Sequence, residues 1–287
     1  MKATVAVIMS VYHGDKPEQI ARAVQSILSQ DQRLIEPPRI YLGVDGAVPA
    51  DISAVLISLS AHIHRTVAFP ENRGLAHVLN DLLDELDGED FVFRMDSDDE
   101  CFPDRFDRQV AYLQSHLDID ILGAAIVERH EDTPPRLVTY PADHRTLVGQ
   151  LYWRGAFAHP TVCFRGTSIN KIGKYPIQAL SEDLALWFHC AESGNVRFAN
   201  LQEPLLYFTV NSNFWKRRGM MRAWRELIVW TKGNFRLYGL SWKVLVPTVR
   251  FGFRLVPSSL QRALYGSRLR VGKRGLGDDS VPEANRA

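Results

Sequence analysis

Blocks of apolar residues alternate with blocks of mixed polarity along the first 130 positions of the chain. The apolar blocks predict strands at residues 4–11, 39–45, 63–69, 91–95 and 119–127. Asp15 can cap a helix that has Pro17 in its first turn and runs to about residue 28, and helical periodicity predicts further helices at 75–86 and at 104–117. Strands separated by helices of about 10–15 residues form βαβ units, so this half predicts an α/β fold with a mostly parallel central sheet flanked by helices.

The second half of the chain is less regular. Strands are predicted at 161–164 and 205–210, with a helix at 183–190 between them. A further helix is predicted at 216–238, and residues 241–270 predict one or two basic amphipathic helices broken near Pro247 and Pro257. Residues 271–287 are rich in Gly, Asp, Pro and Asn, which predicts a disordered tail.

The composition is that of a folded domain. The chain has 287 residues, of which 46% are hydrophobic and 23% charged, so it can bury a core. Cys101, Cys163 and Cys190 are too widely spaced for a zinc site or a disulfide framework, which suits a reducing cytoplasm. The apolar run at 3–9 is too short for a secretion signal, and charges interrupt the apolar stretch at 237–256, so no membrane-spanning helix is predicted.

The net charge of +1 hides a strong asymmetry. Residues 216–287 contain 16 Lys and Arg against 4 Asp and Glu, a net charge of +12, which leaves −11 on residues 1–215. Between 236 and 270 the basic residues interleave with aromatic and aliphatic ones, which is typical of a helix lying on an anionic membrane surface. A helical extension packed on the rest of the protein is the alternative. Nucleic acid would also suit the charge, but no recognition module precedes the segment, so no nucleic-acid partner is predicted.

Asp96, Asp98 and Asp99 follow the predicted strand at 91–95 within four positions. Their carboxylates repel one another unless a cation lies between them. Hard oxygen ligands select Mg²⁺ or Mn²⁺, which complete their shells with phosphate oxygens and water, so one interpretation of the cluster is a metal site for a phosphate-bearing ligand. Taken alone, the cluster is more typical of a solvated loop that caps the next helix. A calcium loop of the EF-hand type is disfavoured because Cys101 stands where its glycine is required.

Three features fall at the carboxyl ends of predicted strands. They are residues 10–12, residues 44–46 and the acidic cluster. Parallel sheets bind their ligands at these ends, so the three features are expected to line one site.

Several motifs occur in an order that resembles the family 2 glycosyltransferases. Residues 93–99, with Pro103, Arg105 and Gln109 after them, resemble the Asp-x-Asp region of that family, and residues 7–12 resemble its first strand and loop. Residues 71–76, with Asn80 further on, resemble its Asn-x-Gly-Leu helix start, and residues 159–161 and 181–183 resemble its acceptor-side motifs. The resemblance spans about residues 3–210. It departs at Ser10 and His13, where the family often has proline and asparagine, and at the shortened motif of residues 45–47.

The resemblance implies a single GT-A-type domain at residues 1–215, followed by the helical extension at 216–270. The nucleotide-sugar half would cover about residues 1–100 and the acceptor half about 101–215. It further implies an inverting, Mn²⁺- or Mg²⁺-dependent hexosyl transfer from a nucleotide-diphosphate sugar, expected to be UDP-linked. The implied acceptor is a hydroxyl group of a saccharide or lipid-linked oligosaccharide in cell-surface polysaccharide synthesis. With the basic helices, such an acceptor predicts a cytoplasmic protein that is peripheral on the inner face of the cell membrane.

The resemblance assigns donor-side roles residue by residue. Asp98 is the implied direct metal ligand, Asp96 lies near the metal and the donor's ribose or sugar, and Asp99 ligates the metal or supports the site. Asp45 would accept a hydrogen bond from the nucleotide base, and Tyr12 would line or stack on that base. The remaining implied donor-binding residues are Asn72, Arg73, Arg217 and Arg218. A core position for Tyr12, and a solvated helix start for the last two arginines, are the alternatives.

On the acceptor side, the resemblance selects Asp183 as the base that takes the proton from the acceptor hydroxyl, with Glu182 as the second choice. The alternative for this segment is a capping motif with Ser181 as N-cap. Trp153 and Trp187 are expected to form a wall for a pyranose ring, or else to belong to the core. His159 either contacts the acceptor or has a structural role.

Two rival functions are considered. A sugar nucleotidyltransferase would carry a Gly-rich basic loop after the first strand, and residues 11–15 lack one. A non-catalytic module that binds a nucleotide or carbohydrate would retain the site without turnover.

Overall fold

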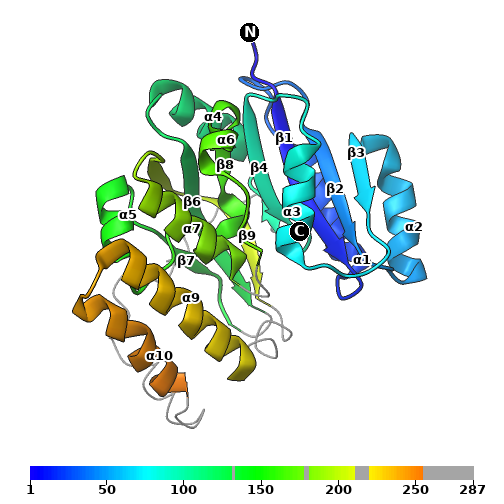
Figure 1. Cartoon of the computed structure of the whole chain (residues 1–287). Helices are drawn as coiled ribbons and strands as arrows, with labels where there is room; N and C mark the ends of the chain where they lie inside the picture. The colour runs from blue at the N-terminus through cyan, green and yellow to red at the C-terminus, as the bar shows by residue number, and fades with distance from the viewer. Residues whose placement is uncertain (131–132, 178–180, 211–219, 255–287) are drawn as a thin grey trace.

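One mixed sheet runs through the molecule. The structure is a computed structural model that describes residues 1–130, 133–177, 181–210 and 220–254 (Figure 1). Within these residues the sheet has nine strands in the order β3-β2-β1-β4-β8-β6-β9-β5, with β7 paired to β6. Its longest pairings are parallel and helices flank it, which confirms the predicted fold class.

Four parallel strands form the first half of the sheet. They are β1 (Val5–Tyr12), β2 (Arg39–Asp45), β3 (Arg65–Ala68) and β4 (Phe91–Asp96). The connections contain α1 (Pro17–Leu28), α2 (Ala50–Leu59), the short η1 (Ser60–His62) and α3 (Leu75–Asp84). The register pairs Tyr12 with Asp45 and Ser10 with Asp96, so β1, β2 and β4 end together. We call this end of the three strands the carboxyl edge.

The second half adds antiparallel pairings. β8 (Cys163–Arg165) joins β4 to β6 (Ile121–His130), β9 (Phe198–Val210) runs parallel to β6, and two short strands, β5 (Glu100–Cys101) and β7 (Arg136–Val138), complete the sheet. The helices of this half are α4 (Arg105–Ser115), α5 (His144–Gln150), α6 (Ile169–Ile172) and α7 (Glu182–Ser193). Two 3-10 turns, η2 (His159–Thr161) and η3 (Gly166–Ser168), flank β8.

The predicted elements differ from the observed ones mainly in this half. The strand expected at 161–164 begins only at Cys163, because residues 159–161 form the turn η2. The strand expected at 205–210 is the last part of the longer β9. The elements α2, α5, α6, β5 and β7 were not predicted. For α2 the reason is visible in the sequence, since its apolar residues lie all round the helix and give no one-sided pattern.

Two apolar clusters lie on opposite faces of the sheet. Alternate residues of β1 point to opposite faces, so Val7 and Met9 join the cluster under α1 and α4, whereas Ala6 and Ile8 join the cluster under α3 and α7. A strand buried on both faces carries almost no polar residue until it reaches its end. The polar side chains that could bind a ligand are therefore concentrated where the strands stop.

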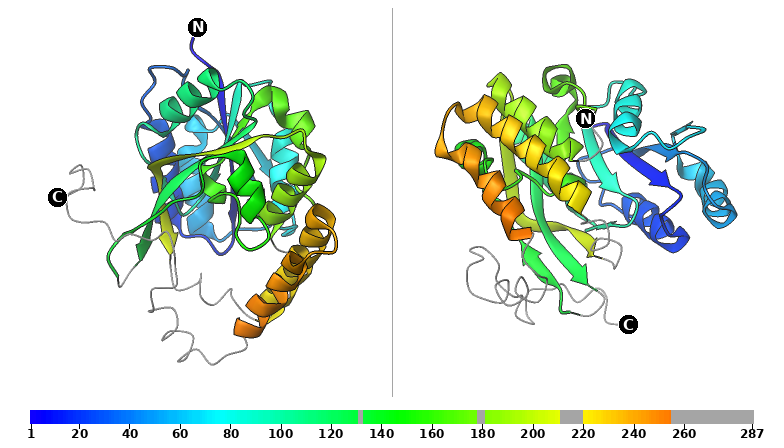
Figure 2. Two further views of the ribbon diagram at one scale, coloured as in Figure 1. Left: turned by 90° about the vertical axis from the view of Figure 1, so that its left-hand side faces the viewer. Right: turned by 60° about the horizontal axis from the view of Figure 1, so that its bottom comes forward.

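A helical extension packs on α7. It consists of α9 (Met220–Tyr238), the 3-10 turn η4 (Trp242–Leu245) and α10 (Val246–Arg254), and the two helices lie side by side below α7 in Figures 1 and 2. The Trp230 ring is buried edge-on against Phe188 at a centroid distance of 5.9 Å. Asn234 is fully buried and donates to the carbonyls of Tyr152 and Lys243. The first part of the extension therefore closes the core over α7.

The break predicted near Pro247 falls at an element boundary, because η4 ends at Leu245 and α10 begins at Val246. Pro247 lies in the first turn of α10, where proline is tolerated. The chain also turns at Gly239, whose φ of +63° is accessible to glycine at no steric cost. The predicted break at Pro257 and the disordered tail at 271–287 fall outside the described residues. Within the described residues, no helix combines the length and the hydropathy required to cross a bilayer.

Candidate active site

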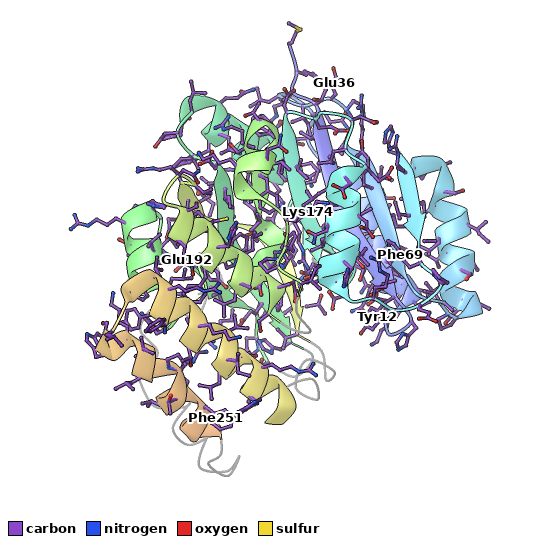
Figure 3. All side chains as sticks on the ribbon, viewed as in Figure 1. Tyr12, Glu36, Phe69, Lys174, Glu192 and Phe251 are labelled. Carbon is purple, nitrogen blue, oxygen red and sulfur yellow. The ribbon has the colours of Figure 1, made fainter. Side chains whose placement is uncertain are left out.

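Tyr12, Asp45 and Asp96 end three adjacent strands and meet at the carboxyl edge. Figure 3 shows Tyr12 and Phe69 at this lower edge of the sheet. The Tyr12 ring is partly exposed and packs edge-on against His13, so Tyr12 is not a core residue. Gly14 lies against the same ring, since a Cβ at Gly14 would come 2.7 Å from its carbon atoms.

Asp45 is buried and organises the loop that follows β3. Its two carboxylate oxygens accept the backbone N–H groups of Arg73 at 2.7 Å and Gly74 at 3.0 Å, and Asn72 Nδ2 donates to its carbonyl at 3.2 Å. A Cβ at Gly46 would lie 2.7 Å from the backbone nitrogen of Asn72, so the two segments approach as closely as glycine permits. The predicted donor-binding residues Asp45, Asn72 and Arg73 therefore come together.

The guanidinium of Arg73 points along α3. It pairs with Asp81 at 2.8 Å and lies 4.8 Å from the centre of the Phe69 ring. Its positive charge is thus held at the border of the carboxyl edge.

The acidic cluster has the geometry of a cation site. Ligand atoms of Asp96, Asp98 and Asp99 all lie within 4.8 Å of one another. Asp99 is 1% exposed; its Oδ1 accepts the N–H of Thr209 at 2.8 Å, while its buried Oδ2 has no hydrogen-bond partner among the described residues. Burial, and then the charges of Asp96 and Asp98, raise the pKa of Asp99 well above its usual value. A buried carboxylate oxygen without a donor, in an all-oxygen cluster, fits Mg²⁺ or Mn²⁺.

Asp15 connects the first strand to the acidic loop. It was predicted to cap α1, but that cap position belongs to Lys16, with Pro17 as the first helical residue. One Asp15 oxygen instead accepts the N–H of Tyr12 at 3.0 Å and the hydroxyl of Ser97 at 2.9 Å. A carboxylate that was expected only as a helix cap therefore fixes the ends of β1 and β4 relative to each other.

Arg105 is a buried residue that supports β4, the strand that leads into the acidic loop. Arg105 is fully buried, and its guanidinium donates to the Arg94 carbonyl at 3.0 Å and to Gln109 Oε1 at 3.1 Å. The Gln109 amide in turn donates to the carbonyls of Leu122 and Thr161. This network explains two motif residues, Arg105 and Gln109, as supports of β4 rather than as ligand contacts.

Glu182 and Asp183, the predicted acceptor-side carboxylates, begin α7. Burial, and then the charge of Asp183, raise the pKa of Glu182 from its usual 4.5 to about 7, and the charges of Arg94 and Asp96 also act on it. Glu182 therefore lies within electrostatic reach of Asp96 in the acidic cluster. Sequence spacing cannot reveal this proximity, because the two motifs are more than 80 positions apart.

Ser181 precedes these carboxylates in an unusual conformation. Its φ of 63° is the only positive value of a non-glycine residue in the described part of the chain. Ser181 is at the N-cap position, but within the described residues its side chain makes no capping hydrogen bond, so the capping-motif alternative does not explain the segment. Such strain is most often retained near functional groups.

The expected sugar-stacking wall does not form. Trp187 is fully buried and packs edge-on against Phe157 at 4.7 Å, so its ring belongs to the core. Trp153 is exposed, but its carbonyl accepts from Arg250 Nη1 at 2.6 Å, which places it beside α10. Sequence alone does not show whether a tryptophan ring packs in the core or stacks on a ligand.

His159 has a structural role. It is buried, and its Nε2 lies 2.9 Å from the Tyr175 hydroxyl. Burial, and then the charge of Arg94, lower the pKa of His159 well below its usual value, so the ring is neutral. The two remaining candidates, Arg217 and Arg218, lie outside the described residues.

Three carboxylates that fit a cation and a strand-end tyrosine lie at one sheet edge, and Glu182 lies within electrostatic reach of Asp96. This arrangement suits an enzyme that transfers a group from a nucleotide diphosphate. The comparison with known proteins agrees. The chain belongs to glycosyl transferase family 2, whose family model matches residues 6–173. Enzymes of this family transfer a sugar with inversion of its anomeric configuration.

Relatives of the chain match almost its whole length. An uncharacterized glycosyltransferase of Haemophilus influenzae is 33% identical over 92% of this chain and 98% of its own. The UDP-Gal:alpha-D-GlcNAc-diphosphoundecaprenol beta-1,3-galactosyltransferase of Escherichia coli is 26% identical over 92% of this chain and 96% of its own. Among solved structures, a mannosyltransferase of Pyrobaculum calidifontis in complex with GDP-Man and Mn²⁺ has a TM-score of 0.62 at 16% identity, covering 92% of this chain and 79% of that one, and it shares the fold.

Proposed function

We propose that this family 2 enzyme moves a hexose from a UDP-linked sugar to a hydroxyl group of a lipid-linked saccharide in cell-surface polysaccharide synthesis. The observation that carries the proposal is the charge interaction between Glu182 and Asp96, which supports a predicted acceptor-side carboxylate near a predicted donor-side one. The galactosyltransferase of E. coli, with a UDP-linked donor and a diphosphoundecaprenol-linked acceptor, supports this choice of substrates.

The donor diphosphate would lie over the acidic cluster. Asp98 and Asp99 would hold Mn²⁺ or Mg²⁺, with Asp96 at the border between the ion and the sugar of the donor. When bound, such an ion offsets the negative charge that develops on the departing diphosphate. Tyr12, held against the acidic loop through Asp15, would line the nucleotide base.

The acceptor hydroxyl would attack from the side of α7. Its oxygen forms a bond to the anomeric carbon as the bond from that carbon to the diphosphate oxygen breaks, and UDP leaves with the bonding electron pair. The hydroxyl proton passes to the Asp183 carboxylate. Attack opposite the leaving group inverts the anomeric configuration.

The raised pKa of Glu182 supports the assignment of Asp183 as the base. With a pKa of about 7, Glu182 holds a proton in much of the population at neutral pH, which removes one negative charge beside Asp183. Asp183 lies in the first turn of α7, where the helix dipole favours an ionised carboxylate. Asp183 can thus accept the proton while Glu182 hydrogen-bonds to the acceptor.

The helical extension would bring the enzyme to a lipid-linked acceptor. Residues 220–254 contain seven Lys and Arg and one Glu. Trp242, Leu245 and Val249 are all exposed, and their spacing of three and four positions places them along one stripe of η4 and α10. An exposed apolar stripe within a basic segment suits the anionic inner face of a cell membrane. The extension would then have two roles. Helix α9 packs on α7, and the stripe on η4 and α10 would contact the membrane.

The test is an assay of the purified full chain. UDP-glucose, UDP-galactose and UDP-GlcNAc are each incubated with Mn²⁺ and a short-chain lipid-diphosphate GlcNAc acceptor, and product stereochemistry is determined by proton NMR. We expect UDP release and an inverted product with one donor, and loss of both in EDTA. Pyrophosphate release from UTP and a sugar phosphate would instead identify a nucleotidyltransferase. Metal-dependent nucleotide binding without any turnover would identify a binding module.

A further inference from the structure

Arg94 is a buried cation directly below the acidic cluster. It lies on β4 two positions before Asp96, so both side chains point to the face of the sheet covered by α7. Its side chain is 2% exposed, and its Nη2 forms an ion pair with Asp96 Oδ1. The Arg94 backbone is also fixed, because its N–H donates to the Val162 carbonyl at 2.9 Å and its carbonyl accepts from Arg105.

The burial of this guanidinium is costly. Arg94 Nε and Nη1 have no hydrogen-bond partner among the described residues. A buried charge that keeps only part of its hydrogen bonds is less stable than an apolar side chain of similar size in the same place. A methionine could fill the same volume, so packing alone does not account for an arginine at this position.

The ion pair contacts only the protein-facing side of Asp96. Asp96 is 33% exposed in its side chain, whereas Arg94 is 2% exposed, so the guanidinium grips the carboxylate from the protein side. The exposed part of the carboxylate remains available at the carboxyl edge. Without this contact, Asp96 could rotate away from Asp98 and Asp99, whose negative charges repel it.

We propose that Arg94 is a positioning residue that holds the Asp96 carboxylate in the orientation required to bind the divalent cation and the donor. The proposal rests on the proposed function, since it gives Arg94 a role in the same site. Groups that hydrogen-bond to a metal-binding carboxylate fix its orientation, and their removal typically weakens metal binding by about 10–100-fold. The planar, forked guanidinium is suited to this task because it fixes an angle as well as a distance.

Metal binding separates positioning from a simple effect of charge. If Arg94 contributed only its charge, then its removal would leave the cluster more negative, and Mn²⁺ would bind more tightly. If Arg94 positions Asp96, then its removal weakens Mn²⁺ binding despite the more negative charge. The two roles predict opposite signs for the same measurement.

The experiment compares three variants of the full chain with the wild type. Arg94→Met removes the guanidinium, and Arg94→Lys keeps the charge but not the fork. The matched control is Arg39→Met, which breaks the 3.2 Å pair with the buried Glu89 at the opposite end of the sheet. Mn²⁺ affinity is measured by calorimetry with and without UDP, and folding is checked by thermal unfolding.

We expect Arg94→Met to weaken Mn²⁺ binding at least about 10-fold, Arg94→Lys to recover part of this loss, and Arg39→Met to bind as the wild type does. Equal or tighter Mn²⁺ binding by folded Arg94→Met would overturn the proposal. If Arg94→Met does not fold, then Arg94→Lys decides, and wild-type affinity in that variant overturns it. If Arg94→Met binds Mn²⁺ more weakly but the wild-type enzyme transfers no sugar, then the positioning role of Arg94 is supported. Only the proposed function is then contradicted.

Discussion

Thr209 on β9 forms hydrogen bonds to both Asp99 and Asp98. The backbone N–H of Thr209 donates to Asp99 Oδ1 at 2.8 Å, and its Oγ1 donates to the Asp98 carbonyl at 2.5 Å. The two residues are 110 positions apart, so β9 fixes the shape of the acidic loop only once the second half of the sheet has formed. A residue with no charge of its own thereby fixes the Asp99 side chain and the backbone at Asp98.

Replacing Thr209 by valine should impair the acidic loop while preserving the shape of β9. The change keeps the N–H contact to Asp99 and removes the hydroxyl contact to Asp98. We expect a loss of about 1 kcal/mol in the free energy of unfolding and weaker Mn²⁺ binding. Urea denaturation and calorimetry measure the two effects. Thr209→Ser, which keeps the hydroxyl, is the matched control, and a loss of equal size there would show that the hydrogen bond is not responsible.

Asp98→Ala and Asp183→Asn should each reduce sugar transfer at least about 100-fold for different reasons. The first removes a cation ligand, so Mn²⁺ binding should fall with activity. The second removes the proton acceptor, so UDP and Mn²⁺ should still bind. Asp84→Asn, at an exposed pair with Lys174 outside the site, is the control and should retain activity. Near-native turnover by Asp183→Asn would transfer the role of base to Glu182.

Glu182 should make the folded protein less stable as the pH rises through neutrality. Its folded-state pKa of about 7 exceeds the usual 4.5, so the stability that comes from its protonated form is present below about pH 4.5 and is lost as the pH rises through 7. Glu182→Gln cannot ionise. We therefore expect this variant to be more stable than the wild type at pH 8, by on the order of 1–3 kcal/mol, with little gain at pH 4.5. Chemical denaturation at both pH values measures the difference, and a gain of equal size at the two pH values would contradict the assignment.

Removing the exposed apolar stripe on η4 and α10 should weaken membrane binding. The double change Leu245→Ser and Val249→Ser removes two exposed apolar side chains without touching α7. We expect about 10-fold weaker binding to vesicles containing phosphatidylglycerol, and little binding of any form to pure phosphatidylcholine. Ile57→Ser, at an equally exposed position on α2, is the control and should bind as the wild type does. Co-sedimentation measures each case, and wild-type binding by the double variant would place the contact elsewhere.

The sequence predicted the features that depend on neighbouring positions. The strand before Asp96, the cluster itself and the alignment of Tyr12 with Asp45 follow from local patterns and from the rules of parallel sheets. Contacts between distant segments were not predictable, and Thr209 on Asp99 is such a contact. Residue type was also an insufficient guide. Aspartate is a favoured helix cap, but Asp15 bridges the ends of two strands instead. Trp187 is on a helix whose apolar residues gave no indication of which ring would be buried.

The close approach of α9 to α7 bears on where the chain can be cut. A Cβ at Gly233 would lie 2.4 Å from the ring carbons of Phe188, so the two helices touch where no side chain intervenes. A truncation at the predicted domain end, residue 215, would strip this cover and leave Phe188 and the buried edge of α7 in water. The helix that loses its cover is the one that begins with Glu182 and Asp183. Shortened forms of the protein made for crystallisation or expression should therefore retain α9.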